Sequence, residues 1–246
     1  MKKVILLTAC VNPNGMALTA LQDTDERLKQ YEDALNWYLI NTNLPILFVE
    51  NTDCDISPKY KAWIEKGRLE MLTFRGNDYP RVLGKGYGEA KILEHALNHS
   101  IFLKDTDIII KITGRLICRN INTIIRRCKR PDTMMSEVIK DRWNRMQCKS
   151  QVVVLPKRYL KDFFLPCSDH LNDTEHYWFE HLLWDASIKW QQNVGRFREF
   201  VSLPKIMGQS GSMGTMYTVS TWDIVIQPLR VFIHRFFHYY GSLKPF

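Results

Sequence analysis

The sequence lacks the patterns that would identify several common classes of protein. Its 246 residues include six cysteines, but none forms a CxxC pair and none stands at zinc-ligand spacing from a histidine. We therefore expect free thiols, which are typical of a reducing compartment. No stretch approaches the ~20 apolar residues that a membrane-spanning helix needs. The apolar run near Met1 is short for a signal peptide, so we interpret it as a strand.

Internal repeats, low-complexity tracts and clear interdomain linkers are also absent, as are helix-turn-helix, RRM and zinc-finger patterns. The HExxH motif is missing, and the spacing of His176 and His181 does not suit a shared metal on one helix face. The composition, with 45% hydrophobic and 24% charged residues, is that of an ordinary globular protein. The formal net charge of +8 favours an anionic partner, such as a nucleotide, a nucleic acid or a lipid headgroup.

Short apolar runs alternate with helical patterns along most of the chain. This order predicts an α/β fold with a Rossmann-like, mostly parallel central sheet flanked by helices. The expected strands are residues 4–8, 45–49, 69–74, 108–110, 134–137 and 151–155, and the expected helices are 23–39, 58–66, 89–98, 156–164 and 173–184.

Residues 105–115, DTDIIIKITGR, are the stretch on which the interpretation depends most. A buried strand that ends in Lys111 and Arg115 delivers cations to the carboxyl edge of the sheet, where open α/β folds bind ligands. The alternative is a strand followed by a solvated lysine and arginine.

Residues 75–89 are rich in glycine and charge and precede an expected helix. The start of that helix, with Lys85 beside it, would offer unpaired N–H groups and the positive end of a dipole to an anion. The stretch is neither a Walker loop nor a Rossmann fingerprint, so an ordinary turn before a helix is the alternative.

Residues 173–184 predict a helix that Asp173 or Thr174 would cap, with its apolar side chains pointing inward. Glu180 lies among aromatic residues on this helix. A raised pKa and a general-base role for its carboxyl group are as reasonable there as a structural hydrogen bond.

Three further stretches each allow two interpretations. Residues 119–130 carry five basic side chains, which form either a basic helix face or a solvated surface. Residues 205–217 combine glycines with small hydroxyl residues, which suits contact with a phosphate or a sugar but also an ordinary surface loop. Residues 224–240 mix aromatic and basic residues, as in an interfacial amphipathic helix or a C-terminal helix packed on the core.

Taken in order, several segments resemble bacterial GT-A-type glycosyltransferases of surface-polysaccharide biosynthesis (capsule, O-antigen and lipooligosaccharide). The segments are LLTACVNPNG, FVENTDCD, GKGYGEAKILEHAL, IIIKITGR, YWFEHLL and GQSGSMG. The resemblance implies a GT-A-like fold in one domain, residues 1–246. Within it we expect a nucleotide-binding half (1–118), an acceptor-side half (119–222) and a basic, aromatic C-terminal helix (223–246).

The resemblance also implies the residues of the site. The donor nucleotide-sugar would contact Thr8, Ala9, Glu50, Asn51, Lys85, Lys111, Gly114 and Arg115. Glu180 would be the base that deprotonates the acceptor hydroxyl in an inverting reaction, with Glu175 as a second catalytic candidate.

The sequence departs from the family pattern at the metal site. GT-A enzymes place a DxD motif at the end of a strand, where it holds a divalent metal on the diphosphate. Here Asp105 and Asp107 precede the apolar run and should lie at the opposite end of the strand. Lys111 and Arg115 would then neutralise the diphosphate, so we expect no metal ligands and no required cofactor.

The acceptor implied by the resemblance is a saccharide or a lipid-linked saccharide. The +8 charge and the C-terminal residues favour a peripheral position on anionic lipid, at the cytoplasmic face of the inner membrane. Two alternatives remain. One is a non-catalytic nucleic-acid-binding protein that uses residues 119–130 and the basic, aromatic C-terminal residues; the other is a nucleotidyltransferase with the same nucleotide-binding half.

Overall fold

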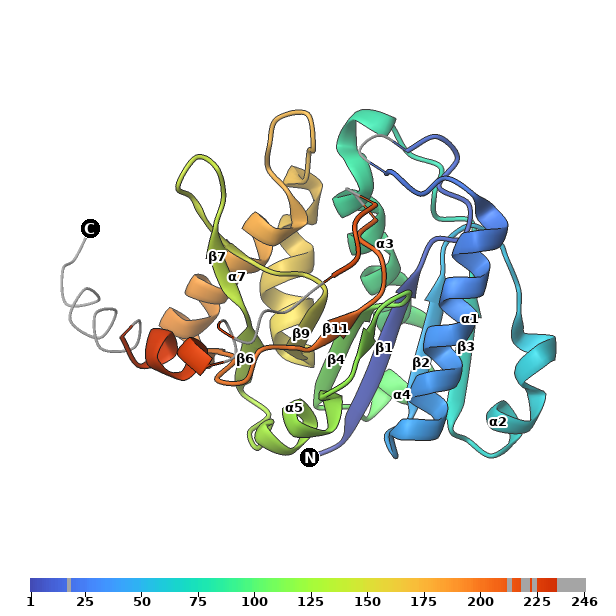
Figure 1. Cartoon of the computed structure of the whole chain (residues 1–246), viewed down its shortest axis with the longest axis horizontal. Helices are drawn as coiled ribbons and strands as arrows, with labels where there is room; N and C mark the ends of the chain where they lie inside the picture. Colours follow the sequence, from blue (N-terminus) through green and yellow to red (C-terminus); the bar gives the residue numbers. More distant parts are fainter. Residues whose placement is uncertain (17–18, 212–213, 218–221, 223–224, 234–246) are drawn as a thin grey trace.

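The computed structural model describes residues 1–16, 19–211, 214–217, 222 and 225–233. Its centre is a seven-stranded sheet with the order β10-β6-β9-β4-β1-β2-β3 (Figure 1). The strands are β1 (Lys3–Ala9), β2 (Ile46–Glu50), β3 (Leu69–Thr73), β4 (Ile108–Thr113), β6 (Thr133–Ser136), β9 (Val152–Pro156) and β10 (Arg196–Glu199).

The sheet is mostly parallel, as the sequence predicts. β9 runs antiparallel to both of its neighbours, β4 and β6, and the other strands share one direction. The carboxyl ends of β1, β2, β3 and β4 therefore meet at one edge of the sheet. We call this edge the carboxyl edge.

Both faces of the sheet are buried, which explains why its strands are nearly continuous apolar runs. Along β1, Ile5 and Leu7 belong to one hydrophobic cluster, whereas Val4 and Leu6 belong to the cluster on the other face. Lys111 lies on the same face of β4 as Ile109, because side chains alternate along a strand.

Helices cover both faces. α1, α2 and α5 contribute to the cluster that contains Ile5, and α3, α4, α6 and α7 contribute to the cluster that contains Val4. Their bounds are α1 (Thr24–Asn41), α2 (Lys61–Glu65), α3 (Gly84–His99), α4 (Ile101–Lys104), α5 (Ile121–Arg127), α6 (Lys157–Tyr159) and α7 (Phe179–Asn193). Short 3₁₀ and π turns accompany them at Ser57–Tyr60, Arg81–Leu83, Leu160–Phe164 and Leu165–His170.

The predicted helix 89–98 begins earlier than expected. Residues 84–88, which were expected to belong to a glycine-rich loop, are already helical. α3 begins at Gly84. Gly84 has a φ of +77°, and a Cβ there would overlap the carboxylate of Asp173. Close packing against neighbouring segments therefore holds a stretch in helical form that its glycines alone would not favour.

The predicted start of the helix 173–184 is also wrong. α7 begins at Phe179, after a tight loop closed by an antiparallel bridge between Asn172 and Tyr177. His176 has a φ of +58°, which interrupts any helix through this segment. Asp173 caps nothing on α7, because its carboxylate lies at the start of α3 instead.

Two small sheets and one strand were not predicted. β7 (Val138–Lys140) and β8 (Met146–Cys148) form an antiparallel hairpin, and β5 (Ile117–Cys118) pairs with β11 (Ile206–Met207). The strand of the central sheet that was not predicted is β10, whose side chains are half-buried or exposed. These strands are too short, or too polar, to give a clear apolar run.

The expected C-terminal helix lies partly outside the described residues. Residues 225–233 are helical, and Gln227 and Val231 pack inward, with the Gln227 amide donating to the carbonyl oxygen of Phe200 at 2.8 Å. Residues 223–224 and 234–246 of the expected helix are outside the described ranges. Within those ranges no helix is both long enough and apolar enough to cross a bilayer.

Candidate functional site

Three guanidinium groups lie within electrostatic range of Cys10, the residue that follows β1. Arg27, Arg81 and Arg115 all act electrostatically on the thiol of Cys10, against one carboxylate, that of Glu50. Burial nevertheless dominates and raises the pKa of Cys10 to about 11, so the thiol stays neutral at physiological pH. The carboxyl edge at β1 therefore carries an excess of positive charge.

Arg27 and Arg115 are both buried in spite of their charge. Arg27 donates to the backbone carbonyl groups of Cys10, Val11 and Leu21. Arg115 donates to the side-chain oxygen of Gln30 at 2.7 Å and to the carbonyl oxygen of Gln209 at 3.4 Å. Neither forms an ion pair among the described residues, so no carboxylate neutralises their charge at this edge.

Two buried polar atoms at the same edge have no hydrogen-bond partner within the described ranges: Oδ1 of Asn51 and Nη1 of Arg81. Asn51 follows β2 and is only 2% exposed. An unsatisfied buried polar atom costs free energy and is rare in native proteins. The unsatisfied donor on Arg81 suits an anionic oxygen of a ligand, and the unsatisfied acceptor on Asn51 suits a hydroxyl or N–H group.

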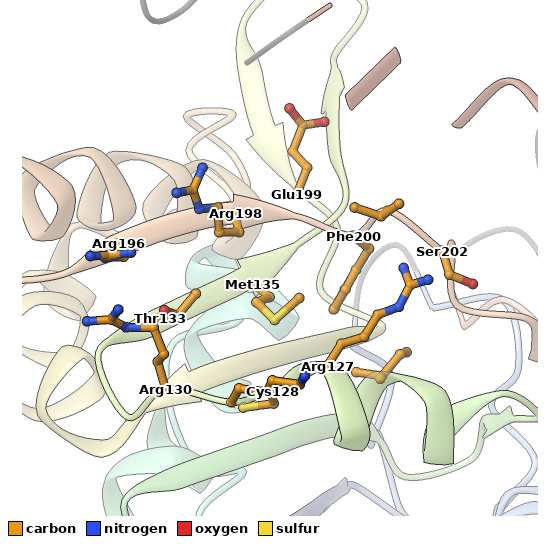
Figure 2. Close-up of a pocket in the computed structure, with 13 residues that line it drawn as sticks. Arg127, Cys128, Arg130, Thr133, Met135, Arg196, Arg198, Glu199, Phe200 and Ser202 are labelled. Atoms are coloured by element: carbon orange, nitrogen blue, oxygen red, sulfur yellow. The ribbon is translucent and has the colours of Figure 1, made fainter. Parts of the chain in front are cut away.

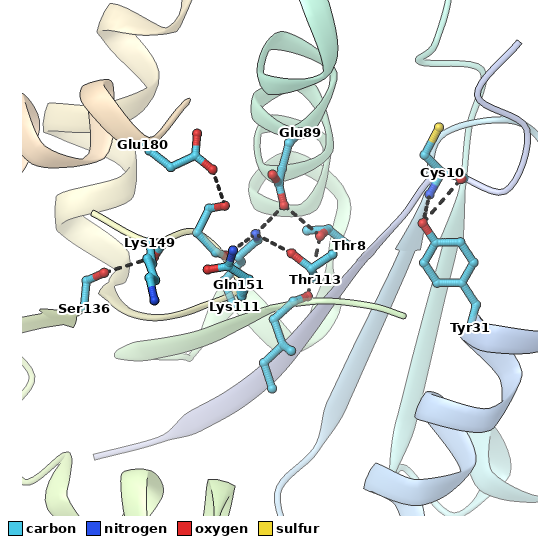
Figure 3. A network of polar contacts seen from close by, with 12 residues as sticks. Thr8, Cys10, Tyr31, Glu89, Lys111, Thr113, Ser136, Lys149, Gln151 and Glu180 are labelled. Carbon is cyan, nitrogen blue, oxygen red and sulfur yellow. Dashed lines mark hydrogen bonds and ion pairs between the residues drawn. The ribbon is translucent and has the colours of Figure 1, made fainter. Parts of the chain in front are cut away.

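Lys111 lies at the centre of a buried polar network (Figure 3). Its side chain is 0% exposed, and its ammonium group is ion-paired with Glu89 on α3. It also donates to the carbonyl oxygen of Ser150 at 2.7 Å. The hydroxyl of Thr8 donates to the same Glu89 oxygen at 3.0 Å. Lys111 thus joins the end of β1 to the residues that precede β9.

The network reaches the predicted base, Glu180. Oε1 of Glu180 accepts a hydrogen bond from the hydroxyl of Ser150 at 2.6 Å, and Ser150 in turn contacts Lys111 (Figure 3). Oε2 makes no hydrogen bond to the described residues. Glu180 is half-buried in the first turn of α7 and could accept a proton through that oxygen. Glu175 is exposed on the loop before α7, away from this network.

Burial contradicts the alternative of a solvated lysine and arginine after β4. Lys111 is fully buried, and Arg115 is nearly so. Gly114 stands between them and the end of β1. Its N–H donates to the carbonyl oxygen of Thr8 at 2.9 Å, and a Cβ there would lie 2.7 Å from that oxygen, so only glycine allows this close approach.

Glu50 and Ala9 differ from the expectation of an open nucleoside pocket. Glu50 is fully buried, and its carboxylate accepts hydrogen bonds from the backbone N–H groups of Val11, Thr52 and Cys54. It therefore shapes the two loops that follow β1 and β2. Ala9 is also buried, and its carbonyl oxygen accepts from the N–H of Asn51 at 3.1 Å.

The start of α3 is not open to an external anion. The carboxylate of Asp173 already lies there, and its Oδ2 accepts a hydrogen bond from the backbone N–H of Lys85 at 3.2 Å. Burial raises the pKa of Asp173, and the charge of Lys85 partly opposes this shift. Lys85 itself has an exposed side chain at the edge of the site.

The aspartates of the DTD stretch lie at the opposite edge, as expected. Oδ2 of Asp107 accepts from the N–H of Lys2 at 2.7 Å, and Asp105 pairs with the Lys2 side chain. Across the described part of the chain, no group of three His, Cys, Asp or Glu side chains is placed to hold a metal ion.

Two cavities lie near the β6 and β9 strands. One, of about 290 Å³, is near the network, because Gln151 lines it and accepts from the N–H of Thr113 through its carbonyl oxygen. Tyr217 and Arg230 also line this cavity. The other, of about 260 Å³, lies between α5 and the strands β6 and β10, where Figure 2 shows Arg127, Arg130 and Arg196 around it. It contains none of the predicted site residues.

Comparison with known proteins gives no family. No family model matches the sequence, and no curated protein matches it. Among solved structures, the chain is similar to a candidate nucleotide-diphospho-sugar transferase from Desulfovibrio desulfuricans G20, with 12% identity and a TM-score of 0.48 over 81% of this chain and 80% of that one.

Two other similar structures differ in activity. The mannosyltransferase Ktr4p from S. cerevisiae has 10% identity and a TM-score of 0.46, over 81% of this chain and 68% of that one. A 4-diphosphocytidyl-2C-methyl-D-erythritol synthase from Anaerococcus prevotii has 10% identity and a TM-score of 0.40, over 93% and 95%. Likenesses at this level do not decide between sugar transfer and nucleotidyl transfer.

The sequence interpretation missed Arg27, Arg81, Glu89 and Ser150. Arg27 and Glu89 were hidden in ordinary helical patterns, where a charged residue is usually exposed. A charged residue on the expected inward face of a helix is the one signal that could have found them. Arg81 begins a single 3₁₀ turn and Ser150 lies between β8 and β9, and both segments are too short to give a periodicity.

Proposed function

We propose that the protein is a glycosyltransferase that moves a sugar from a nucleotide-sugar donor to a saccharide or a lipid-linked saccharide. The observation that supports this most is the carboxyl edge, where Arg27, Arg81 and Arg115 all act on the Cys10 thiol. At the same edge, Nη1 of Arg81 and Oδ1 of Asn51 are buried with no hydrogen-bond partner among the described residues. Guanidinium groups bind phosphate oxygens well because their N–H donors form a rigid fork. A nucleoside diphosphate is the donor fragment that this edge suits.

The reaction is an inverting displacement. Oε2 of Glu180 takes the proton of an acceptor hydroxyl, the hydroxyl oxygen attacks the anomeric carbon, and the bond from that carbon to the diphosphate breaks. The nucleoside diphosphate leaves with an added negative charge, which Arg27, Arg81 and Arg115 stabilise. These fixed cations do the work that a divalent metal does in enzymes with a DxD site, so transfer is metal-independent.

The acceptor is presented at an anionic membrane surface, on the inner face of the cytoplasmic membrane. The support comes from helix 225–233, which packs inward through Gln227 and Val231 and leaves Leu229 and Phe232 exposed at 57% and 67%. Arg230 lies on the same helix. An exposed apolar stripe next to a cation is typical of helices that lie in the membrane interface.

A thermal-shift screen tests the proposed reaction. UDP, GDP, CDP and CMP are added with and without Mn²⁺, because a ligand that binds only the folded state raises Tm. We expect one nucleoside diphosphate to raise Tm equally in EDTA and in Mn²⁺, and the matching nucleotide-sugar to release that diphosphate. Release of pyrophosphate from a nucleoside triphosphate would instead identify a nucleotidyltransferase, and no shift with any nucleotide would refute both.

A further inference from the structure

Aromatic rings and guanidinium groups gather on the loops next to Glu180. Trp143 lies in the loop between β7 and β8, and its ring centroid is 4.8 Å from that of His176 and 5.7 Å from that of Trp178. The guanidinium carbon of Arg142 lies 4.0 Å from the Trp143 centroid and that of Arg145 lies 4.9 Å from it. We call Trp143, His176 and Trp178 the aromatic platform.

Asp141 holds the loop that carries Trp143 in place. The side chain of Asp141 is 2% exposed and accepts from the N–H groups of Trp143 and Arg145, each at 2.8 Å. It also accepts from Nε of Arg145 at 2.8 Å and lies 3.1 Å from Nε2 of His181. Burial alone would raise the pKa of Asp141, but these hydrogen bonds outweigh it and lower the pKa to about 2.

Further contacts join the two loops of the platform. Nη2 of Arg145 donates to the carbonyl oxygen of His176 at 2.9 Å. Trp178 stacks on His181, with ring centroids 5.1 Å apart and planes within 18°. His181 is itself buried in the first turn of α7. A surface fixed by so many contacts before any ligand arrives loses little entropy when one binds.

The platform stands beside the proposed catalytic base. Trp178 directly precedes α7, and Glu180 lies in the first turn of that helix. In Figure 1 the loop between β7 and β8 and the loop before α7 extend to the same side of the molecule, beyond the edge to which β1 points. Glu180 thus lies two residues after Trp178, at the start of the helix into which the platform loop leads.

The chemistry of the platform indicates what it binds. Trp143 is 43% exposed, and its ring lies against those of His176 and Trp178, so an aromatic face is accessible next to two other rings. Arg145 is engaged with Asp141 and His176. Arg142, apart from its stacking on Trp143, has no partner among the described residues. An aromatic face next to an unpaired guanidinium group suits a ring with an apolar face that also carries a carboxylate or a phosphate.

We infer that the aromatic platform, with Arg142, is the acceptor subsite and binds a saccharide that carries an acidic group. This inference rests on the proposed glycosyl transfer for its role, but the binding itself does not require the donor. The sugar ring stacks on Trp143 and Trp178, and Arg142 binds the carboxylate or phosphate. The acceptor hydroxyl then faces Glu180.

The test is ¹⁹F NMR of the full chain labelled with 5-fluorotryptophan, with resonances assigned from Trp143→Phe and Trp178→Phe. Three probes are titrated: trigalacturonate carries carboxylates, maltose 1-phosphate carries a phosphate, and maltotetraose is neutral. We expect the Trp143 and Trp178 resonances to shift, with a Kd at least about tenfold lower for one acidic probe than for maltotetraose. The probe that binds tighter identifies the acidic group.

Two variants separate stacking from charge recognition. Trp143→Ala should raise the Kd of the acidic probe about fivefold or more, because stacking on one aromatic ring is typically worth ~1–3 kcal/mol. Arg142→Gln should remove the preference for the acidic probe and leave maltotetraose binding unchanged. The matched controls, Trp222→Ala and Arg126→Gln, change an exposed tryptophan and an exposed arginine elsewhere and should leave both Kd values unchanged.

Three results would overturn the inference. These are no shift of the two resonances with any saccharide, an unchanged Kd in Trp143→Ala, and tighter binding of a dT oligonucleotide than of the saccharides. The last would make the platform a stacking surface for single-stranded nucleic acid. If the nucleotide thermal shift persists while saccharide binding fails, the acceptor subsite is wrong and the proposed donor site stands.

Discussion

The ammonium group of Lys111 on β4 is ion-paired with the carboxylate of Glu89 on α3, in a part of the core where Lys111 is completely buried. The pair fixes the position of α3 over the end of β1, since Glu89 also accepts from the Thr8 hydroxyl. It also holds Lys111 against Ser150, the residue that contacts Glu180. The donor edge and the proposed base are thus connected through one buried charge pair.

The first prediction concerns the stability that this pair provides. Lys111→Met should lower the free energy of unfolding by roughly 3 kcal/mol, because it leaves the Glu89 carboxylate without its partner. This loss is at the low end for buried ion pairs because the Glu89 side chain remains one-fifth exposed. Adding Glu89→Gln to this variant should recover part of the loss. Urea unfolding measures both.

The control for this prediction is another lysine ion pair of α3. Lys91 pairs with Glu94 at 2.9 Å on the surface, and Lys91→Met should cost less than about 1 kcal/mol. Equal losses of unfolding free energy in Lys111→Met and Lys91→Met would show that the buried pair stabilises the fold no more than the surface pair does.

The second prediction concerns Arg81. Because Nη1 of Arg81 has no partner within the described residues, Arg81→Gln should change stability little. It should nevertheless weaken binding of the active nucleoside diphosphate by about tenfold or more, since a hydrogen bond to a charged group contributes ~1.5–3 kcal/mol. Isothermal titration calorimetry gives the Kd, with Arg126→Gln on α5 as the control. A Kd that stays the same in Arg81→Gln would remove Arg81 from the donor site.

The third prediction concerns the protonation of His181. Burial lowers the pKa of His181 and Arg145 acts in the same direction, whereas Asp141 opposes both. The backbone N–H of Trp178 donates to Nδ1 of His181 at 3.2 Å. The neutral His181 ring should therefore carry its proton on Nε2 and donate it to the carboxylate of Asp141. Asp141→Asn removes the opposing charge and should lower the pKa further.

The pH dependence of stability follows from the sign of this shift. The unfolded state binds the proton at a higher pH than the folded state, so the contribution of His181 is complete above about pH 6.5 and falls as the pH drops toward the folded-state pKa. NMR titration of the ring carbons measures the pKa, with the resonance assigned by its loss in His181→Gln. A pKa in Asp141→Asn equal to or above that of the wild type would contradict this account of the contact.

Much of the sheet was predictable because β1, β2, β4 and β9 are buried on both faces and are therefore unbroken apolar runs. The starts of α3 and α7 were not, because both depend on one tertiary contact. Asp173 reaches the start of α3, and the residues around it then form a loop before α7. Local propensity cannot show that an aspartate belongs to a helix far away in the sequence.

The site was predicted in part for a similar reason. Lys111 lies in the second half of β4, and Gly114 and Arg115 follow it, so their place near the carboxyl edge follows from the strand itself. That Lys111 is paired and buried depends on Glu89, and that Nη1 of Arg81 has no hydrogen-bond partner among the described residues depends on the tertiary position of the short turn Arg81–Leu83. Neither fact leaves a pattern in the sequence.

The fourth prediction concerns metal dependence. Asp105 and Asp107 lie at the edge of the sheet opposite Arg27, Arg81 and Arg115, where Asp107 accepts from the Lys2 N–H. The double variant Asp105→Asn/Asp107→Asn should therefore leave the nucleotide-induced shift in Tm unchanged. EDTA should also leave sugar transfer unchanged. Activity that EDTA abolishes and Mn²⁺ restores would contradict the metal-independent mechanism, and its loss in the double variant would assign the metal to these two aspartates.

The last prediction concerns the membrane. Leu229 and Phe232 are exposed on helix 225–233, whereas Gln227 and Val231 hold that helix to the protein. Leu229→Asp/Phe232→Asp should therefore keep the fold but lose binding to liposomes that contain phosphatidylserine, because two charges replace the apolar stripe and repel the anionic surface. Co-sedimentation measures the bound fraction, and an unchanged Tm confirms that the variant is folded.

A matched control separates insertion from a general effect of added negative charge. Ile40 is exposed at 75% near the end of α1, and Ile40→Asp/Lys29→Asp makes the net charge at least as negative as the Leu229 and Phe232 changes do without touching helix 225–233. This control should bind liposomes more tightly than Leu229→Asp/Phe232→Asp. If both variants lose binding to the same extent, the +8 net charge alone explains the attraction, and helix 225–233 does not enter the membrane interface.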